Sequence, residues 1–308
     1  MANRWKPERP LQIVAGTPPG GGLDRVARAL AQALEEAHVL EVPVEVLNVP
    51  GDGARRAWTE EVDRHAGDAH VLGISSPNLT TDYLVGIASF EHRRYTPIAT
   101  LVNEYIAFAV SSASELKTGT DLIAGLAKAP ERVTVALSTA LGNPNHVALA
   151  RLARHARADV GAPKVRVFDS AVDAVADVVR GNADVCAVTA ATVLKELAAG
   201  HLRVLAVSSP ERLAGDLASV RTWVEQGVDC VIGAWRGVSG PAGLSDDQVQ
   251  FWAGCLSVAV RQSSWRDQLR SMQWSPMLRT REQLSDFLTA ERDEFVSVLG
   301  NLGLLKRR

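Results

Sequence analysis

A glycine-rich turn near the N-terminus carries the clearest chemical signal in this sequence. Residues 17–24 read TPPGGGLD, between an apolar run at 11–15 and a stretch at 25–37 in which apolar residues recur at helical spacing. Glycine lets other groups approach the backbone closely, and the first N–H groups of a helix have no acceptor within that helix. Such a strand-to-helix turn can bind a carboxylate or another small anion. We expect Asp24 to be the N-cap residue of the helix.

Motifs for other chemistry are missing from the sequence. The turn lacks the Gly-Lys-Ser/Thr ending of a P-loop and the GxGxxG of a dinucleotide site, and no Gly-x-Ser-x-Gly segment marks a hydrolase nucleophile. The spacing of the three cysteines, Cys186, Cys230 and Cys255, is not that of a metal site, and at most one pair could form a disulfide. Cys186 lies in an apolar run, which is typical of a thiol in the core. We therefore expect no catalytic residue, no metal site and no cofactor.

Polar loops that follow strands supply the other candidate ligand contacts, because ligands of open α/β sheets bind beyond the carboxyl ends of the strands. Ser138 and Thr139 offer hydroxyls and amides shortly before a helix, where the helix dipole stabilises a carboxylate by about 0.3–1 kcal/mol. The remaining residues that we expect to contact a ligand are Thr17, Pro19, Gly20, Gly21, Asp24, Ser75, Ser76, Asn78, Leu141, Asn145, His146, Asp169, Ser170, Thr189 and Trp235.

Several of these residues also have a purely structural interpretation. Asp24 and Asp169 would repel an anion at close range, so both can instead cap the helices that follow them. An acid beside the site would suit a ligand that carries an amine or a hydroxyl. We interpret His146 as a helix-start residue, Trp235 as a core residue or a ligand platform, and Arg236 as a carboxylate fork or a surface residue.

The elements that must position these loops alternate between strand and helix, which predicts an α/β fold with largely parallel sheets flanked by helices. Strands are expected at 11–15, 44–47, 70–74, 98–101, 106–110, 133–137, 165–168, 185–188, 204–207 and 231–233. Helices are expected at 25–37, 54–64, 120–129, 146–156, 171–181, 190–199, 217–226, 245–260, 265–272 and 281–299. Thr280 and Gln283 predict a capping box at the start of the last helix.

One large or two medium domains are expected from 308 residues, and the sequence contains no low-complexity linker. Strands that cross between the domains would explain this, and the best candidates lie at 107–110 and 231–236. We therefore expect one lobe from residues 1–107 and 236–308, and a second lobe from residues 108–235.

The overall composition excludes two classes of protein. The formal net charge of −2 argues against a nucleic-acid partner, and no run reaches the roughly 18 apolar residues of a membrane span. The first seven residues, MANRWKP, contain no apolar signal segment. On this basis the chain is either cytoplasmic or an exported protein without its signal peptide.

Several short motifs, each weak by itself, occur in a specific order. They are PPGGGLDRVAR at 18–28, NVPGDG at 48–53, GNPNH at 142–146, GNAD at 181–184, GHLRVLAV at 200–207 and WRG at 235–237. In order and spacing they resemble the Bug family, the extracytoplasmic solute-binding proteins of tripartite tricarboxylate transporters. The resemblance covers nearly the whole chain. The sequence departs from the family pattern at Leu23, at Ala54 and at 168–170, where FDS replaces the usual Tyr-Lys-Gly.

The resemblance implies a two-lobed periplasmic-binding-protein fold of the Venus flytrap kind, with each lobe built on a mostly parallel sheet. It also implies a small carboxylate held between the lobes, delivery to membrane transporter subunits, and a periplasmic location after removal of a signal peptide. We expect a monomer without enzymatic activity that closes about a hinge when its ligand bridges the lobes. Two alternatives stay open: a carboxylate sensor with a signalling partner, and, less favoured, a small-molecule hydrolase.

Overall fold

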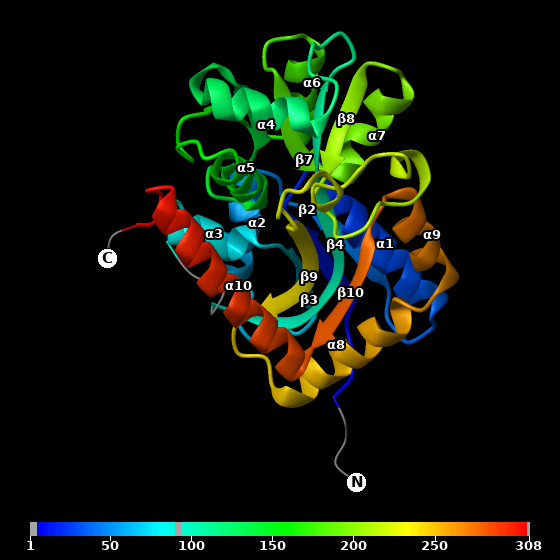
Figure 1. Ribbon diagram of the computed structural model, residues 1–308. Coiled ribbons are helices and arrows are strands. Elements are labelled where there is room, and N and C mark those ends of the chain that lie inside the picture. Colours follow the sequence, from blue (N-terminus) through cyan, green and yellow to red (C-terminus); the bar gives the residue numbers. More distant parts are fainter. Residues whose placement is uncertain (1–4, 90–93, 307–308) are drawn as a thin grey trace.

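The computed structural model describes residues 5–89 and 94–306, and the ten strands in this part of the chain join one curved mixed sheet (Figure 1). The strand order is β2-β1-β3-β9-β4-β7-β5-β6, and β8 and β10 each pair with β4. The strands are β1 (Leu11–Ala15), β2 (Val44–Asn48), β3 (Val71–Ser75), β4 (Tyr95–Ser111), β5 (Thr134–Ser138), β6 (Lys164–Phe168), β7 (Val185–Thr189), β8 (Leu202–Val207), β9 (Gly233–Pro241) and β10 (Ser275–Thr280).

Helices cover the sheet and follow most strands, as the alternating pattern predicts. They are α1 (Gly22–Glu36), α2 (Arg55–Arg64), α3 (Asn78–Leu84), α4 (Gly119–Lys128), α5 (Pro144–His155), α6 (Ala171–Val179), α7 (Ala190–Ala198), α8 (Asp246–Ala259), α9 (Ser263–Ser271) and α10 (Arg281–Asn301). Within the described residues, none of these helices has the length and apolar character needed to cross a membrane.

The long strand β4 joins two hydrophobic cores. Its first half, up to Val102, packs into the first core with β1, α1, α8 and α9, whereas residues from Ile106 onward pack into the second core with β5 and β7. Side chains alternate between the two faces of a strand, so Phe108 and Ala109 enter different clusters on opposite faces. Figure 1 shows the same arrangement, with α4–α7 gathered at one end and α1, α8 and α9 at the other.

The two predicted crossing segments lie in β4 and at the start of β9. We expected two strands at 98–101 and 106–110, but β4 is continuous because it pairs with β9 up to Tyr105 and with β7 from Ile106. The strand predicted at 231–233 is instead β9, which begins at Gly233 and continues to Pro241.

Two local predictions were wrong, and two elements were missed. The predicted helix at 217–226 contains only two short 3₁₀ turns, because Trp223 is buried against Phe108 and its N–H binds the carbonyl of Val207. The polar edge strand β10 and the buried polar helix α3 were both missed, since neither has the apolar periodicity of its type. Thr280 is the N-cap of α10, but its side chain makes no capping hydrogen bond.

The three cysteines, Cys186, Cys230 and Cys255, are free and buried. Cys186 is completely inaccessible within the apolar cluster that contains Ala109, which confirms its prediction as a core thiol.

Candidate functional site

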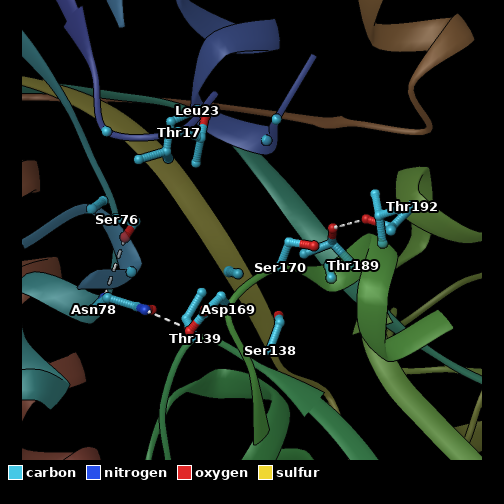
Figure 2. Close-up of a pocket in the computed structure, with 18 of the residues that line it drawn as sticks. Thr17, Leu23, Ser76, Asn78, Ser138, Thr139, Asp169, Ser170, Thr189 and Thr192 are labelled. Carbon is cyan, nitrogen blue, oxygen red and sulfur yellow. Dashed lines mark hydrogen bonds between the residues drawn. The ribbon is translucent and has the colours of Figure 1, made fainter. Parts of the chain in front are cut away.

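A cavity of about 600 Å³ opens where the two cores meet, beyond the carboxyl ends of the strands. Loops that follow β1, β2 and β3 line it from the first core, and loops that follow β5, β6 and β7 line it from the second. Figure 2 shows Thr17 and Leu23 on one wall of this pocket, with Ser138, Thr139 and Thr189 on other walls. The pocket therefore occupies the position at which open α/β sheets bind ligands.

Most of the residues that the sequence nominated line this pocket. They are Thr17, Gly20, Gly21, Ser76, Asn78, Ser138, Thr139, Asn145, Asp169, Ser170 and Thr189. The nominated residues that do not line it are Pro19, Asp24, Ser75, Leu141, His146 and Trp235. Ligand contact by the lining residues stays a prediction, whereas several of the others have clear structural roles.

The Asp24 side chain stabilises the β1–α1 turn by hydrogen bonds and does not cap α1. The N-cap residue is Gly21, and the Asp24 carboxylate accepts hydrogen bonds from the Gly20 amide at 2.7 Å and from Asn48 Nδ2 at 2.8 Å. The Asp24 amide donates to Thr17 Oγ1 at 3.1 Å. Burial by itself would raise the pKa of Asp24, but the hydrogen bonds from Asn48, Arg28 and Gly20 outweigh it and lower that pKa below its usual value. The carboxylate therefore fixes the loop and is not directed at a ligand.

In this arrangement, two backbone amides at the start of α1 have no hydrogen-bond acceptor within residues 5–89 and 94–306. Among the described residues, no acceptor is found for the N–H groups of Gly22 and Leu23, and both residues line the pocket. Arg25 lies on the same wall and donates from Nη1 to the Gly20 carbonyl at 3.0 Å. A helix N-terminus with free amides beside a guanidinium favours a bound anion.

Arg236 supplies a second guanidinium, which is paired with a buried acid, Glu104. Its Nη2 lies 2.6 Å from Glu104 Oε2, and Glu104 Oε1 accepts a hydrogen bond from Trp274 Nε1 at 2.6 Å. Glu104 on β4 is only 1% exposed, so the ion pair fixes the Arg236 side chain on β9 where it lines the pocket. This placement favours the carboxylate-fork interpretation over the surface interpretation.

Thr139 contributes a hydroxyl to the pocket but not a free amide. Its N–H already donates to the Phe168 carbonyl at 2.8 Å, so the expected amide contact is wrong. Thr139 Oγ1 accepts from Asn78 Nδ2 at 3.0 Å and from Asn143 Nδ2 at 2.9 Å. With these two donors already bound, the hydroxyl proton remains able to donate to an acceptor in the pocket. The Asn78 contact also ties the two walls together.

His146 and Trp235 are structural. His146 Nδ1 accepts a hydrogen bond from the Gly142 amide at 3.0 Å, and burial lowers the pKa of His146 to about 4, so the ring is neutral. Trp235 turns away from the pocket and donates to the Glu291 carboxylate at 2.7 Å. Both side chains are buried.

Asp169 is not a helix cap, because the N-cap residue of α6 is Ser170. The Ser170 hydroxyl oxygen accepts from the Asp173 amide at 3.1 Å. Asp169 lines the pocket, and Figure 2 shows it beside Thr139.

The main segment that sequence reasoning missed is the loop after β2, where residues 50–54 line the pocket. Gly51 and Gly53 have φ values of +140° and +64°, and a Cβ on Gly53 would lie 3.3 Å from Thr139 Cβ. Two glycines directly after a strand were the available signal for this loop. Arg25 and Thr192 also line the pocket and were missed, since each lies within a helix.

The lining groups are suited to binding. They are amides, hydroxyls, carboxamides and a few charges, and the described residues contain no group of three or more His, Cys, Asp or Glu placed to hold a metal.

Comparison with known proteins gives a consistent result. A family model described as the tripartite tricarboxylate transporter family receptor matches residues 26–304. BugT of Bordetella pertussis is 24% identical over 304 residues, which cover 96% of this chain and 90% of BugT.

Solved structures share the fold. Rpa4515 of R. palustris, solved with adipate, superimposes with a TM-score of 0.84 at 20% identity over 96% of this chain and 98% of that chain. MatC of Rhodopseudomonas palustris, solved with malate, gives a TM-score of 0.79 at 22% identity over 95% of this chain and 99% of that chain. These similarities confirm the two-lobed α/β fold. The chain belongs to the tripartite tricarboxylate transporter receptor family, as its resemblance to the Bug proteins predicted.

Proposed function

We propose that this protein is a periplasmic solute-binding protein that captures a small carboxylate between two lobes and delivers it to the membrane subunits of a tripartite transporter. In this proposal the lobes are residues 1–107 with 236–308, and residues 108–235. The protein acts as a monomer, without a cofactor and without catalysis.

The free amides of Gly22 and Leu23 are the observation that carries the proposal. Gly22 and Leu23 line a pocket of about 600 Å³ together with Arg25, so a carboxylate bound by these amides gains charge-assisted hydrogen bonds and a favourable helix dipole. The family match and the malate and adipate bound to structurally similar proteins also support a carboxylate ligand.

The arrangement of β4 and β9 supports a hinge mechanism. These two antiparallel strands pair along most of β9, and β4 continues into the second core. A ligand that contacts loops from both lobes stabilises the closed state through contacts that the open state lacks.

The alternatives receive less support. A hydrolase needs a base beside its nucleophile, whereas His146 is neutral, bound by the Gly142 amide and outside the pocket lining. A sensor would use the same pocket, and binding of this protein to a signalling partner rather than to transporter subunits would support that alternative.

Substitution of Gly22 tests the carboxylate site. Gly22 is the first residue of α1, where proline is tolerated, and Gly21 before it is extended, as proline requires. Gly22→Pro removes one free N–H, whereas Gly22→Ala keeps it and adds a Cβ whose nearest neighbour, Arg236 Nη2, is 3.8 Å away.

Calorimetric titration with the acid that gives the largest thermal shift in a carboxylate panel provides the readout. We expect Gly22→Pro to weaken binding at least tenfold and Gly22→Ala to change it less than threefold, with similar melting temperatures. Equal affinities of the two variants would contradict this placement of the carboxylate.

A further inference from the structure

The charged side chains that line the pocket are separated by sign. Arg25 and Arg236 lie near the N-terminus of α1, where a Cβ on Gly22 would be 3.8 Å from Arg236 Nη2. Asp169 and Asp173 lie at the start of α6, on the opposite lobe. The pocket therefore has a cationic side and an acidic side.

A third acid, Asp52, adds to the acidic side. Although it belongs to the β2–α2 loop, the next residue, Gly53, packs against Thr139 across the pocket. The Thr139 amide in turn binds the carbonyl of Phe168, the residue that precedes Asp169. Asp52 and Asp169 are thus each one residue away from a residue that contacts Thr139. The Gly53 Cβ position also lies 3.4 Å from Arg55 Nη1, but that guanidinium is already paired with Asp82.

The three acids on this side are exposed, and within the described part of the chain none of them is paired with a basic side chain. Among the described residues, no hydrogen bond or ion pair is recorded for the Asp169 side chain, and Asp173 is contacted only by Ser170, through its hydroxyl at 2.6 Å. On the cationic side, by contrast, Arg236 is paired with Glu104. The three lining acids outnumber the two lining arginines, and one of those arginines is already paired.

This distribution disfavours a ligand with two carboxylates. One carboxylate is matched by the free amides of Gly22 and Leu23, but a second one at the far end would meet Asp169 and its acidic neighbours. Like charges at close range repel, and this repulsion grows when the lobes close over a ligand and exclude water.

We propose that the ligand is an amino carboxylate, with its carboxylate at the N-terminus of α1 and its cationic nitrogen facing Asp169. This inference rests on the proposed function and narrows the ligand class. A cationic nitrogen satisfies Asp169 and relieves the repulsion among the acids, whereas a hydroxyl at the same place supplies only a hydrogen bond.

Calorimetric titrations with matched ligands test the proposal. Each ω-amino acid is compared with the dicarboxylate of similar length: β-alanine with succinate, γ-aminobutyrate with glutarate, and δ-aminovalerate with adipate. Linear α-amino acids of three to six carbons and γ-hydroxybutyrate complete the set. We expect the best amino carboxylate to bind at least tenfold more tightly than the best dicarboxylate and than the hydroxy acid.

Variants then locate the cationic nitrogen. Asp169→Asn is expected to lower the affinity for the best amino carboxylate about tenfold. The affinity for dicarboxylates is expected to stay unchanged or to improve. Glu131→Gln, which removes an exposed acid of the same lobe outside the pocket lining, is the matched control and is expected to change neither.

The outcomes separate this proposal from the proposed function. Tighter binding of dicarboxylates, equal binding of the hydroxy acid, or an Asp169→Asn variant with unchanged preference would overturn the amino carboxylate while keeping the carboxylate receptor. Failure of every carboxylate to bind, on protein refolded to remove carried-over ligand, would overturn both.

Discussion

Three glutamates, the buried Glu61 and Glu104 and the half-buried Glu291, have very different surroundings. Glu104 is paired with Arg236, and Glu291 accepts a hydrogen bond from Trp235. Glu61 on α2 instead lies directly over Gly73 of β3, where any Cβ would overlap its carboxyl group. Burial raises the pKa of Glu61 to about 8, and the nearby Gly73 backbone offsets this only in part. The role of each acid is therefore set by its partner.

Glu61 makes stability depend on pH. Because its folded-state pKa is raised, the folded protein keeps a proton that the unfolded chain loses above about pH 4.5, and stability falls until about pH 8. We expect the free energy of unfolding of Glu61→Gln, relative to the unsubstituted protein, to rise by roughly 2–4 kcal/mol between pH 5 and pH 8. Urea denaturation at both pH values measures this, with Glu60→Gln on the same helix as the control. A difference that does not change with pH would contradict a protonated Glu61.

The helix α5 and the loop before it depend on other elements. Asn143 caps α5 by accepting from the His146 amide at 3.1 Å, and its Nδ2 donates to the Ser138 carbonyl at 2.6 Å. Beside it, Gly142 has a φ of +87° and faces Val85 and Leu299, from the α3 and α10 regions. This loop therefore connects the pocket to an apolar cluster formed by α3, α5 and α10.

Gly142→Ala tests that contact. The added Cβ would lie 2.7 Å from Val85 Cγ1 and 2.9 Å from Leu299 Cδ2, in addition to the strain of a positive φ. We expect a loss of about 2–4 kcal/mol, composed of roughly 1 kcal/mol of backbone strain and the rest from overpacking. Gly181→Ala is the matched control, because Gly181 has a φ of +75° but nothing within 4 Å of its Cβ position. Equal losses in thermal or urea unfolding would show that the packing contact contributes nothing.

At the scale of the whole molecule, contacts between the two lobes include β4 and β9, the apolar contact of α5 with α10, the Arg151–Glu294 ion pair and a hydrogen bond across the pocket mouth. The contact across the pocket mouth is the hydrogen bond from Asn78 Nδ2 to Thr139 Oγ1 at 3.0 Å. A contact worth about 0.5–1.5 kcal/mol can bias closure without preventing opening.

Asn78→Ala is therefore expected to shift the ligand-free protein toward an open form and to lower ligand affinity about two- to tenfold. Small-angle X-ray scattering would show a larger radius of gyration for the ligand-free variant, which contracts when ligand saturates it. Asn182→Ala removes a side-chain hydrogen bond to Asp177 within one lobe and serves as the control. An unchanged ligand-free radius with unchanged affinity would contradict a role of Asn78 in closure.

Much of this organisation follows from the sequence alone. The alternation of apolar strands and amphipathic helices determines the α/β class, because burial on a sheet or a helix face imposes these periods along the chain. Loops after the strands were therefore identified correctly, and most nominated residues line the pocket. The motif order also placed the chain in its family.

The tertiary structure decided what each loop residue does. Asp24 binds Asn48, Trp235 binds Glu291 and the Thr139 amide binds Phe168, all partners more than twenty residues away. These choices left the amides of Gly22 and Leu23 free and turned Trp235 out of the pocket. Local sequence fixes backbone period and turn chemistry, but hydrogen-bond partners and side-chain direction depend on distant segments, so they are settled only when the chain has folded.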